Sequence, residues 1–403
     1  MAKQSNGVGP RSSETSGIYA HIVGWGMSVP DTRLTNEDLE AILDTNDAWI
    51  QSRTGIRERR IAGERDSTVT LGFKAAKQAL EVTDILPSEI DLIIVATSTP
   101  ESVFPTTASL IQNWLGANHA GAFDLSAACS GFVYGIQMAA QSIRSGSIKT
   151  ALVIGSEVMS RVMDWQDRST CILFGDGAGA VVLQGSETEG GVLSAVLRSD
   201  GSGYDLLGLP VQGSRDNNGY RKPNRMFMIG SEVFKFATRV IGESITEATV
   251  RAGIRLTDVK LIIPHQANDR ILQAAARSLD LDRSIFMSNL AQYGNTSAAS
   301  IPIALCEAVR EGRIQEGDYI VLVGFGGGLA WGSVVIKWGI PQPQERQGSR
   351  LNRERRRAAY ALVGVRARLR HWSRRLSRLF SQVRPNYGRL HRLRRKIDQY
   401  DLE

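Results

Sequence analysis

Cysteine is scarce in this sequence, which has only Cys129, Cys171 and Cys306 among 403 residues. Because the three are odd in number and far apart, they exclude a disulfide framework and any CxxC metal site, and they favour a reducing compartment. Long apolar runs are also missing, since no stretch approaches the roughly 18 apolar residues of a membrane-spanning helix. The leader, residues 1–17, lacks the apolar core of a signal peptide. We therefore expect a cytoplasmic protein of ordinary globular composition.

Acidic residues are scarce only at the C-terminal end. Residues 341–403 contain 18 Arg or Lys and five Asp or Glu, whereas residues 1–340 contain 30 Arg or Lys and 36 Asp or Glu. The formal net charge of +7 therefore belongs to the tail, and the body of the chain is acidic. This division excludes a generally basic, nucleic-acid-binding body.

Short β-rich runs alternate with helix-length segments from Ile18 onward. Near-continuous apolar strands separated by amphipathic helices predict an α/β protein whose strands are buried on both faces. The predicted strands are residues 91–99, 150–157, 178–185, 260–266, 319–326 and 332–339. The predicted helices include residues 71–82 and 231–253.

A faint internal repeat relates the two halves of the chain. SEIDLII (88–94) aligns with TDVKLII (257–263) at an offset of 169 residues. With three residues of slippage, Cys129 aligns with Asn295. The sequence therefore predicts two copies of one βαβ-containing unit, with Cys129 and Asn295 at equivalent strand-to-helix turns.

Cys129 has the setting of a nucleophile. It follows a short apolar run that ends at Asp124, small residues precede it, and a helical period begins just after it. This pattern predicts a thiol at the N-terminus of a buried helix, where backbone N–H groups and the helix dipole favour the thiolate. Cys171 and Cys306 fit the usual role of inert, buried cysteines.

Two further segments supply polar groups for chemistry. His265 ends an apolar run and is followed by amides, at a strand end where α/β proteins place reacting groups. Asn295 lies among small residues in GNTSAAS, where the alternative role is an ordinary helix cap. The glycines of GFGGG (324–328) follow a buried strand, and we expect their N–H groups to form an oxyanion hole with the Cys129 N–H.

The motifs AACSGF, PHQAN, GNTSAAS, FGDGAGA and GFGGG resemble those of ketoacyl-acyl-carrier-protein synthase III, the initiating condensing enzyme of type II fatty-acid synthesis. The resemblance runs from about Ile18 to Gly339, with the motifs in order. It implies a thiolase-like fold, in which two duplicated βαβαβ halves form a layered αβαβα core. The expected parts are a disordered leader (1–17), a nucleophile-bearing half (18–190), a His/Asn half (191–340), and a linker with a helical basic tail (341–403).

The resemblance also implies a reaction. Cys129 attacks an acyl-CoA thioester and becomes acylated. Malonyl-acyl-carrier protein then loses CO2, and His265 and Asn295 donate hydrogen bonds to the enolate that forms. The carbanion attacks acyl-Cys129, whose oxyanion is held by the N–H groups of Cys129 and Gly327, while Phe325 supports decarboxylation. No metal or cofactor is implied, because the two thioesters are substrates.

Substrate-binding roles follow from the same resemblance. Four residues match positions that bind CoA: Trp49, Arg53, Arg168 and Asn268. Three match basic positions that face the acidic carrier protein: Lys235, Arg270 and Arg277. Phe104 matches a residue that crosses a homodimer interface to cap the partner's acyl pocket.

This sequence departs from the family pattern at two places within the body. Asp269 follows PHQAN, where an apolar residue is more usual, and we expect this acid beside Arg270 to weaken carrier-protein docking. The polar loop 204–225 shapes the acyl tunnel in relatives and leaves the chain length of the primer open.

The tail lies beyond the region of resemblance. Apolar residues recur at spacings of three and four from Leu362 to Val383, Trp372 among them, beside a parallel stripe of arginines. A basic amphipathic helix with a tryptophan suits an anionic membrane surface. A helix packed on a partner subunit, a carrier-protein docking arm, an RNA-binding arm and a solvated appendage are the alternatives.

Three functions remain open from the sequence. The first is decarboxylative condensation that initiates fatty-acid synthesis, and the second is a condensing or acyl-transfer reaction of specialised, polyketide-like metabolism. Cys129, His265 and Asn295 serve both. The third is a tail-anchored scaffold with a vestigial enzyme body, which an intact set of these three residues argues against.

Overall fold

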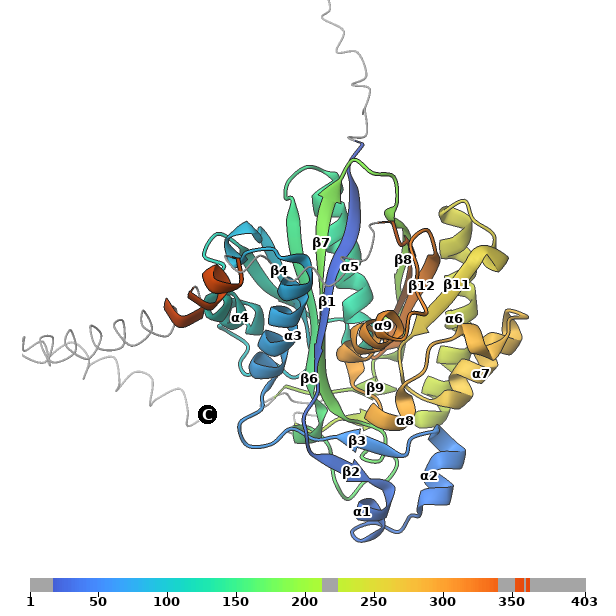
Figure 1. Cartoon of the computed structure of the whole chain (residues 1–403). Coiled ribbons are helices and arrows are strands. Elements are labelled where there is room, and N and C mark those ends of the chain that lie inside the picture. Colours follow the sequence, from blue (N-terminus) through green and yellow to red (C-terminus); the bar gives the residue numbers. More distant parts are fainter. Residues whose placement is uncertain (1–16, 212–223, 340–351, 359, 363–403) are drawn as a thin grey trace, which may run out of the picture.

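Two mixed β-sheets form the body of the chain in the computed structural model, which describes residues 17–211, 224–339, 352–358 and 360–362 (Figure 1). The five-stranded sheet has the order β1-β7-β6-β4-β5, and the four-stranded sheet has the order β8-β13-β12-β11. The first sheet consists of β1 (Tyr19–Ser28), β4 (Leu92–Ala96), β5 (Gly121–Leu125), β6 (Thr150–Val158) and β7 (Asp176–Ser186). The second consists of β8 (Gly191–Ser199), β11 (Val259–Pro264), β12 (Tyr319–Gly326) and β13 (Ala330–Lys337).

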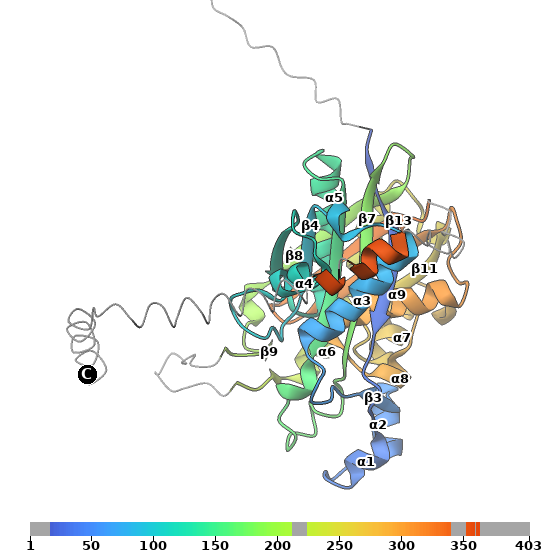
Figure 2. The same cartoon turned by 60° about the vertical axis from the view of Figure 1, so that its left-hand side comes forward.

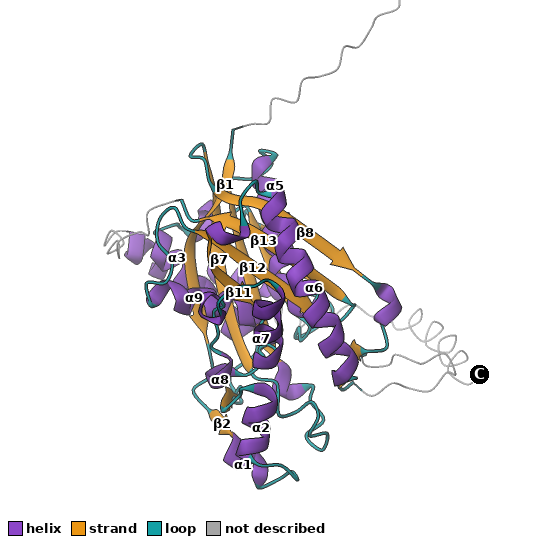
Figure 3. Cartoon of the chain, turned by 90° about the vertical axis from the view of Figure 1, so that its right-hand side faces the viewer, coloured by secondary structure: helices purple, strands orange, loops and turns teal. Residues whose placement is uncertain are grey.

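Helices cover both outer faces and fill the space between the sheets, so that five layers alternate as αβαβα (Figure 3). The central layer is α5 (Gly131–Arg144) and α9 (Ser300–Arg310). The outer layers are α3 (Thr68–Thr83) with α4 (Thr107–Leu115), and α6 (Gly230–Arg251) with α7 (Asp269–Ser278). Smaller elements lie at one end: β2 (Arg33–Thr35), α1 (Asn36–Glu40), α2 (Asp47–Thr54), β3 (Glu58–Arg60), β9 (Leu207–Gly208), β10 (Phe227–Met228) and α8 (Leu290–Tyr293). The predicted α/β class, the six predicted strands and the two predicted helices are confirmed.

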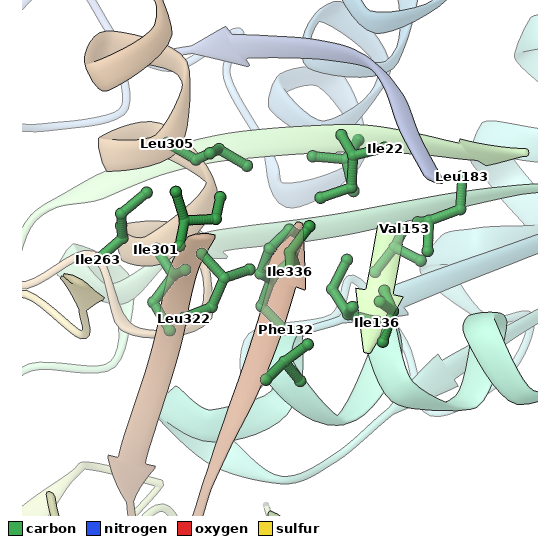
Figure 4. Packing of buried hydrophobic residues seen from close by; sticks show 14 of the residues in the cluster. Ile22, Phe132, Ile136, Val153, Leu183, Ile263, Ile301, Leu305, Leu322 and Ile336 are labelled. Atoms are coloured by element: carbon green, nitrogen blue, oxygen red, sulfur yellow. The ribbon is translucent and has the colours of Figure 1, made fainter. Parts of the chain in front are cut away.

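The central helices carry the largest apolar core, because both sheets pack against them. Phe132 of α5 and Ile301 of α9 lie between side chains of the two sheets, such as Val153 and Leu322 (Figure 4). Strand β6 is buried along its whole length, which explains its unbroken apolar sequence. Truncating one of these large side chains to alanine should cost about 2–5 kcal/mol of stability.

The duplication is present, but its register differs from the expected one. A short 3-10 turn at Ala128–Ser130 leads into α5, and an equivalent turn at Ser297–Ala299 leads into α9, at the full offset of 169 residues. Ala128 and Ser297 both adopt a positive φ, of 45° and 50°. Cys129 is therefore equivalent to Ala298, and the predicted alignment of Cys129 with Asn295 is wrong. The three residues of slippage lie after these turns, because α9, with 11 residues, is shorter than α5, with 14.

Part of the C-terminal tail packs on the body. Residues 352–358 and 360–362 are helical and lie on the outer face of α3 (Figure 2). The Arg356 side chain is only 3% exposed, and its Nη1 donates to Asp84 Oδ1 over 2.7 Å. Asn352 Nδ2 donates to the other oxygen of Asp84 over 2.9 Å. Asp84 is the C-cap of α3, so these bonds join the tail to the end of that helix.

Aromatic contacts extend this attachment. Phe73 of α3 packs edge-on against Tyr360 of the tail and Trp114 of α4, with ring centroids 6.0 and 5.6 Å apart. Lys77 Nζ lies 4.9 Å from the centroid of the Tyr360 ring. Part of the predicted tail therefore packs against the body, although the family resemblance ends at Gly339. The predicted linker at 341–349 and nearly all of the apolar stripe beyond Leu362 lie outside the described residues.

Candidate active site

A cavity of about 1000 Å³ opens where strands of both sheets end. Cys129 lies within the turn that leads into α5, Asn295 lies just before the equivalent turn that leads into α9, and His265 follows the last residue of β11. All three side chains line this cavity although they are far apart in the sequence. The other predicted site residues in its lining are Trp49, Arg53, Asn268, Phe325 and Gly327.

Glycine allows the end of β12 to pass directly against Cys129. A Cβ atom at Gly326 would lie 2.9 Å from the Cβ of Cys129 and 3.0 Å from its backbone nitrogen, closer than real Cβ atoms approach. Gly327 follows and lines the cavity beside Cys129. The GFGGG motif thus allows the backbone to pass directly against Cys129.

Burial dominates the electrostatics of Cys129, which is 7% exposed. Loss of hydration raises the pKa of the thiol to about 12, the Ser297 hydroxyl opposes this rise, and the charge of Glu157 adds to it. Burial therefore favours the thiol and opposes the thiolate that the helix start is expected to favour. Acylation requires a route by which this proton leaves.

His265 is held as a neutral hydrogen-bond donor. Its Nδ1 lies 2.7 Å from the Ser300 Oγ, which also receives the Gln266 backbone N–H over 3.4 Å. Because that oxygen accepts from the backbone, its own hydrogen is free to point at Nδ1, which leaves the ring proton on Nε2. Burial lowers the pKa of His265 to about 3, so the ring is neutral at physiological pH. The ring of Phe325 packs edge-on against it, 5.1 Å between centroids.

Asn295 is not a helix cap, because the N-cap residues of the 3-10 turn and of α9 are Thr296 and Ala299. Its Oδ1 accepts the backbone N–H of Ser297 over 2.8 Å. Its Nδ2 is then the group left to donate into the cavity. A neutral imidazole and a side-chain amide therefore both line the cavity that contains Cys129.

One cluster at the mouth of the cavity contains three of the predicted CoA-binding residues, namely Trp49, Arg53 and Arg168. The guanidinium carbons of Arg53 and Arg168 lie 5.7 and 5.1 Å from the Trp49 ring centroid. Asn268 Oδ1 caps α7 by accepting the Arg270 N–H, and its Nδ2 donates to the Arg53 carbonyl over 3.0 Å. Arg168 does not line the cavity itself and pairs with Asp44 at 3.6 Å.

The predicted docking residues lie outside the cavity. Lys235 on α6, with Arg270 and Arg277 on α7, are exposed. Asp269 does not act on Arg270 in the way expected, because its carboxylate forms an ion pair with Arg283 at 2.6 Å. The basic face of α7 therefore keeps its charge, and the expected weakening of docking has no structural basis.

Phe104 points away from its own cavity. The side chain is 83% exposed and is absent from the lining, which includes the neighbouring Val103. β5 is an edge strand of its sheet, and Phe123 on it is 38% exposed. An apolar surface thus lies beside an unpaired strand edge.

Sequence reasoning missed three polar residues that contact the site: Glu157, Ser297 and Ser300. The two serines belong to GNTSAAS, whose residues after Asn295 were interpreted only as small. Glu157 has a sequence signal, because it is a lone carboxylate that follows the apolar run of a fully buried strand. No group of His, Cys, Asp and Glu suited to hold a metal occurs among the described residues.

Comparisons with known families agree with this site. The profile "3-Oxoacyl-[acyl-carrier-protein (ACP)] synthase III" matches residues 123–201, and the profile of the C-terminal part of the same enzymes matches residues 250–338. The chain is 53% identical over 325 residues to a Beta-ketoacyl-[acyl-carrier-protein] synthase III of Desulfitobacterium hafniense (strain DSM 10664 / DCB-2), which covers 80% of this chain and 98% of that protein. A Clostridium acetobutylicum protein of the same name is 49% identical over 321 residues, covering 79% and 98%.

A solved structure is similar over the same region. The crystal structure of 3-oxoacyl-[acyl-carrier-protein] synthase III from Aquifex aeolicus VF5 aligns with a TM-score of 0.74 and 47% sequence identity. The alignment covers 79% of this chain and 99% of that one. About a fifth of this chain therefore has no counterpart in that structure.

Proposed function

This chain belongs to the 3-oxoacyl-[acyl-carrier-protein] synthase III family, and from that premise we propose that it condenses an acyl-CoA primer with malonyl-acyl-carrier protein through an acyl-Cys129 intermediate. The observation that carries the proposal is the single cavity lined by Cys129, His265 and Asn295. The protein is then an acyltransferase of the kind that initiates fatty-acid synthesis, with the two thioesters as substrates and no bound cofactor.

The first half-reaction takes place at Cys129. Its thiolate attacks the thioester carbonyl of acyl-CoA, and the negative charge moves onto the carbonyl oxygen. We assign the N–H groups of Cys129 and Gly327 to receive that charge. When the tetrahedral intermediate collapses, the bond to the CoA sulfur breaks and the acyl group stays on the enzyme.

The second half-reaction uses His265 and Asn295. Loss of CO2 from the malonyl group leaves a carbanion whose charge spreads onto the thioester oxygen. The Nε2–H of His265 and the Nδ2–H of Asn295 donate to that oxygen, and Phe325 holds the imidazole ring from the side. No base is required, because decarboxylation itself generates the carbanion. This division suits a histidine that burial keeps neutral.

Binding of the two substrates is assigned to different surfaces. The adenine and phosphates of CoA suit the aromatic ring and two guanidinium groups of the cluster around Trp49, and Asn268 contacts the pantetheine arm. The acidic carrier protein suits the exposed cations of α6 and α7, namely Lys235, Arg270 and Arg277.

A Trp49→Ala variant should raise KM for acyl-CoA alone, and an Arg270→Glu variant should raise KM for the carrier protein alone.

The reaction is tested by mass spectrometry. The protein is exposed to a panel of acyl-CoAs, its intact mass is measured, and malonyl-acyl-carrier protein is then added. We expect acylation by at least one primer, followed by a 3-oxoacyl-carrier protein that has lost CO2. Transfer of the acyl group without loss of CO2 would favour an acyltransferase of specialised metabolism instead. The panel also gives the primer length and branching that the cavity accepts.

We propose a homodimer in which Phe104 closes the acyl pocket of the partner. The support is the combination of an edge strand, β5, with exposed Phe104 and Phe123 beside it, a surface that would pair with a second copy. Phe123→Lys should convert the protein to a monomer in light scattering. A wild-type mass of one subunit would contradict the proposal.

We place the enzyme in the cytoplasm, with its tail touching an anionic membrane face. Among the described helices, none has the length and apolarity needed to cross a bilayer. Support for surface contact comes from the 18 cations and five acids of residues 341–403. The bonds of Arg356 and the packing of Tyr360 would hold such a basic tail at a defined point on the body.

Two truncated chains separate attachment of the tail from membrane binding. A chain ending at Gly339 should unfold at a temperature a few degrees lower than the full chain, because Asp84 loses Arg356 and Phe73 loses Tyr360, for a total of about 1–3 kcal/mol. A chain ending at Leu362 keeps these contacts and should match the full chain in thermal unfolding. Equal unfolding temperatures for all three chains would contradict the attachment.

The same chains test the membrane contact. The full chain should sediment with vesicles of phosphatidylglycerol but not phosphatidylcholine, and less so in high salt, because exposed charges are screened within about 8–10 Å at physiological ionic strength. The chain ending at Leu362 should lose this binding and keep its condensing activity. Equal vesicle binding by both chains would reject the contact.

A further inference from the structure

Glu157 is a wholly buried carboxylate that none of the steps above uses. It lies near the end of β6 and is 0% exposed. Both of its oxygens lie 3.0 Å from the backbone nitrogen of Ser98. Three hydroxyl groups donate to it as well, from Thr99 over 2.6 Å, from Thr97 over 3.2 Å and from Ser297 over 3.0 Å. Among the described residues it takes part in no ion pair.

The surrounding bonds set the direction of these hydrogens. The Thr97 hydroxyl oxygen accepts the Thr99 N–H over 3.1 Å, and the Thr99 hydroxyl oxygen accepts the Val158 N–H over 2.9 Å. Each hydroxyl therefore has its own hydrogen free to give to Glu157. The carboxylate is surrounded by donors, an arrangement that fits its ionised form.

Ser297 connects this carboxylate to the nucleophile. Because its hydroxyl donates to Glu157, its oxygen faces Cys129 as an acceptor, 3.5 Å from Sγ. The bond from its backbone N–H to Asn295 Oδ1 holds it in place. Hydrogen bonds thus link the Cys129 S–H group, in the first half of the fold, to the Ser297 hydroxyl in the second half. The same hydroxyl is bonded to the Glu157 carboxylate, which belongs to the first half again.

The reaction needs an acceptor for the thiol proton of Cys129. His265 is a poor candidate, since burial lowers its pKa to about 3 and its Nε2 already carries a hydrogen. Burial raises the pKa of Glu157, although its hydrogen bonds oppose the rise, and a raised pKa lets a carboxylate hold a proton. Ser297 lies between Cys129 and Glu157 and is hydrogen-bonded to both.

We propose that Glu157, acting through Ser297, takes the thiol proton of Cys129 during acylation and returns it when Cys129 is released. This inference rests on the proposed function. As the thiolate attacks acyl-CoA, the S–H proton passes to the Ser297 oxygen and the Ser297 hydroxyl proton passes to Glu157. The CoA sulfur leaves as a thiolate and takes a proton from solvent. In the condensation step the bond between Cys129 and the acyl carbon breaks, and the stored proton returns to Cys129 by the same route.

The stored proton also changes the charge near the second half-reaction. In the acyl-enzyme Glu157 is neutral, so no buried carboxylate opposes the negative charge that decarboxylation creates. At low effective dielectric such a repulsion is large, because it is poorly screened by solvent. Glu157 is thus a positioning residue for protons, and Cys129 remains the catalytic residue.

The test compares the pH dependence of Cys129 reactivity in two variants and a control. Glu157→Gln keeps the side-chain size but cannot hold the proton, and Ser297→Ala removes the bridge while keeping the carboxylate. Asp176→Asn is the matched control, because Asp176 is also a 0% exposed carboxylate but bonds to Ser160 and Ala62 instead. Acylation by acetyl-CoA and alkylation by iodoacetamide are both measured between about pH 6 and 9.

We expect both relay variants to be acylated about 100-fold more slowly near neutral pH, with KM for acetyl-CoA unchanged. Their rates should rise with pH, because hydroxide can then remove the thiol proton, whereas wild type and Asp176→Asn should change little. An infrared difference spectrum of the acylated wild-type protein should contain the carbonyl band of a protonated carboxyl, and this band should be missing in Glu157→Gln.

Three results would overturn the relay. A pH-independent loss in both variants would indicate a purely structural role. Faster alkylation of Glu157→Gln at neutral pH would mean that Glu157 only raises the thiol pKa through its charge. A wild-type acyl-enzyme without the carboxyl band would exclude proton storage. Since alkylation needs no acyl-CoA, these outcomes are distinguishable from a wild-type protein that accepts no acyl group, which would contradict the proposed function itself.

Discussion

Cys129→Ser should abolish acyl transfer from acyl-CoA, with a loss on the order of 10³-fold or more. Cys129 is the one cysteine in the lining of the cavity, and it lies beside the glycine turn to which we assign the oxyanion hole. A serine hydroxyl in this buried site is a far weaker nucleophile than a thiolate. The gain in intact mass after incubation with acyl-CoA measures the effect.

The two other cysteines are matched controls. Cys171 and Cys306 are both 0% exposed, lie in separate apolar clusters and do not line the cavity. Cys171→Ser and Cys306→Ser should therefore be acylated as fast as wild type, although each loses some stability. Acylation that persists in Cys129→Ser would refute the assignment of the nucleophile.

His265→Ala and Asn295→Ala should each lose decarboxylation by about 10²- to 10³-fold while still accepting an acyl group on Cys129. In the proposed reaction each side chain supplies one N–H group to the enolate oxygen, and in the structure the two side chains bond to Ser300 and Ser297. Release of CO2 from malonyl-acyl-carrier protein measures the first property, and intact mass after exposure to acyl-CoA measures the second. If the variants instead fail at acylation yet decarboxylate normally, the assignment of His265 and Asn295 to decarboxylation is wrong.

The low pKa of His265 adds a pH criterion to this prediction. A donor that stays neutral down to about pH 3 does not titrate near its ordinary pKa of about 6.5. Decarboxylation by wild type should therefore show no change of rate with a midpoint near 6.5. Such a midpoint, absent from His265→Ala, would mean that the histidine acts as a base.

Local sequence was sufficient for the elements and for most of the site. The apolar run of β6 and the helical period after Cys129 are short-range patterns, because burial on two faces and a 3.6-residue repeat are expressed within ten or so residues. His265 and Asn295 could be named because strand ends and turns before helices are recognisable from neighbouring residues. The family motifs then supplied Gly327 and Trp49, which no periodicity indicates.

Contacts between distant residues were beyond the sequence. The bond of Arg356 to Asp84 joins residues 272 positions apart, whose separation in space depends on the complete packing of the layers. The register of the repeat also needed the structure, since only the two turns at Ala128 and Ser297 reveal where the halves coincide.

The sequence by itself determined that the chain is a layered α/β protein, that Cys129 begins a helix, and that His265 and Asn295 are its partners. These features depend on residue type and spacing along a short stretch of chain. Only the tertiary structure decided that Cys129 rests as a thiol, that His265 is neutral, and that Glu157 reaches the thiol through Ser297. Protonation depends on burial and on hydrogen-bond partners, and these partners lie well outside the local sequence, since Ser300 is 35 positions from His265 and Ser297 is 168 from Cys129.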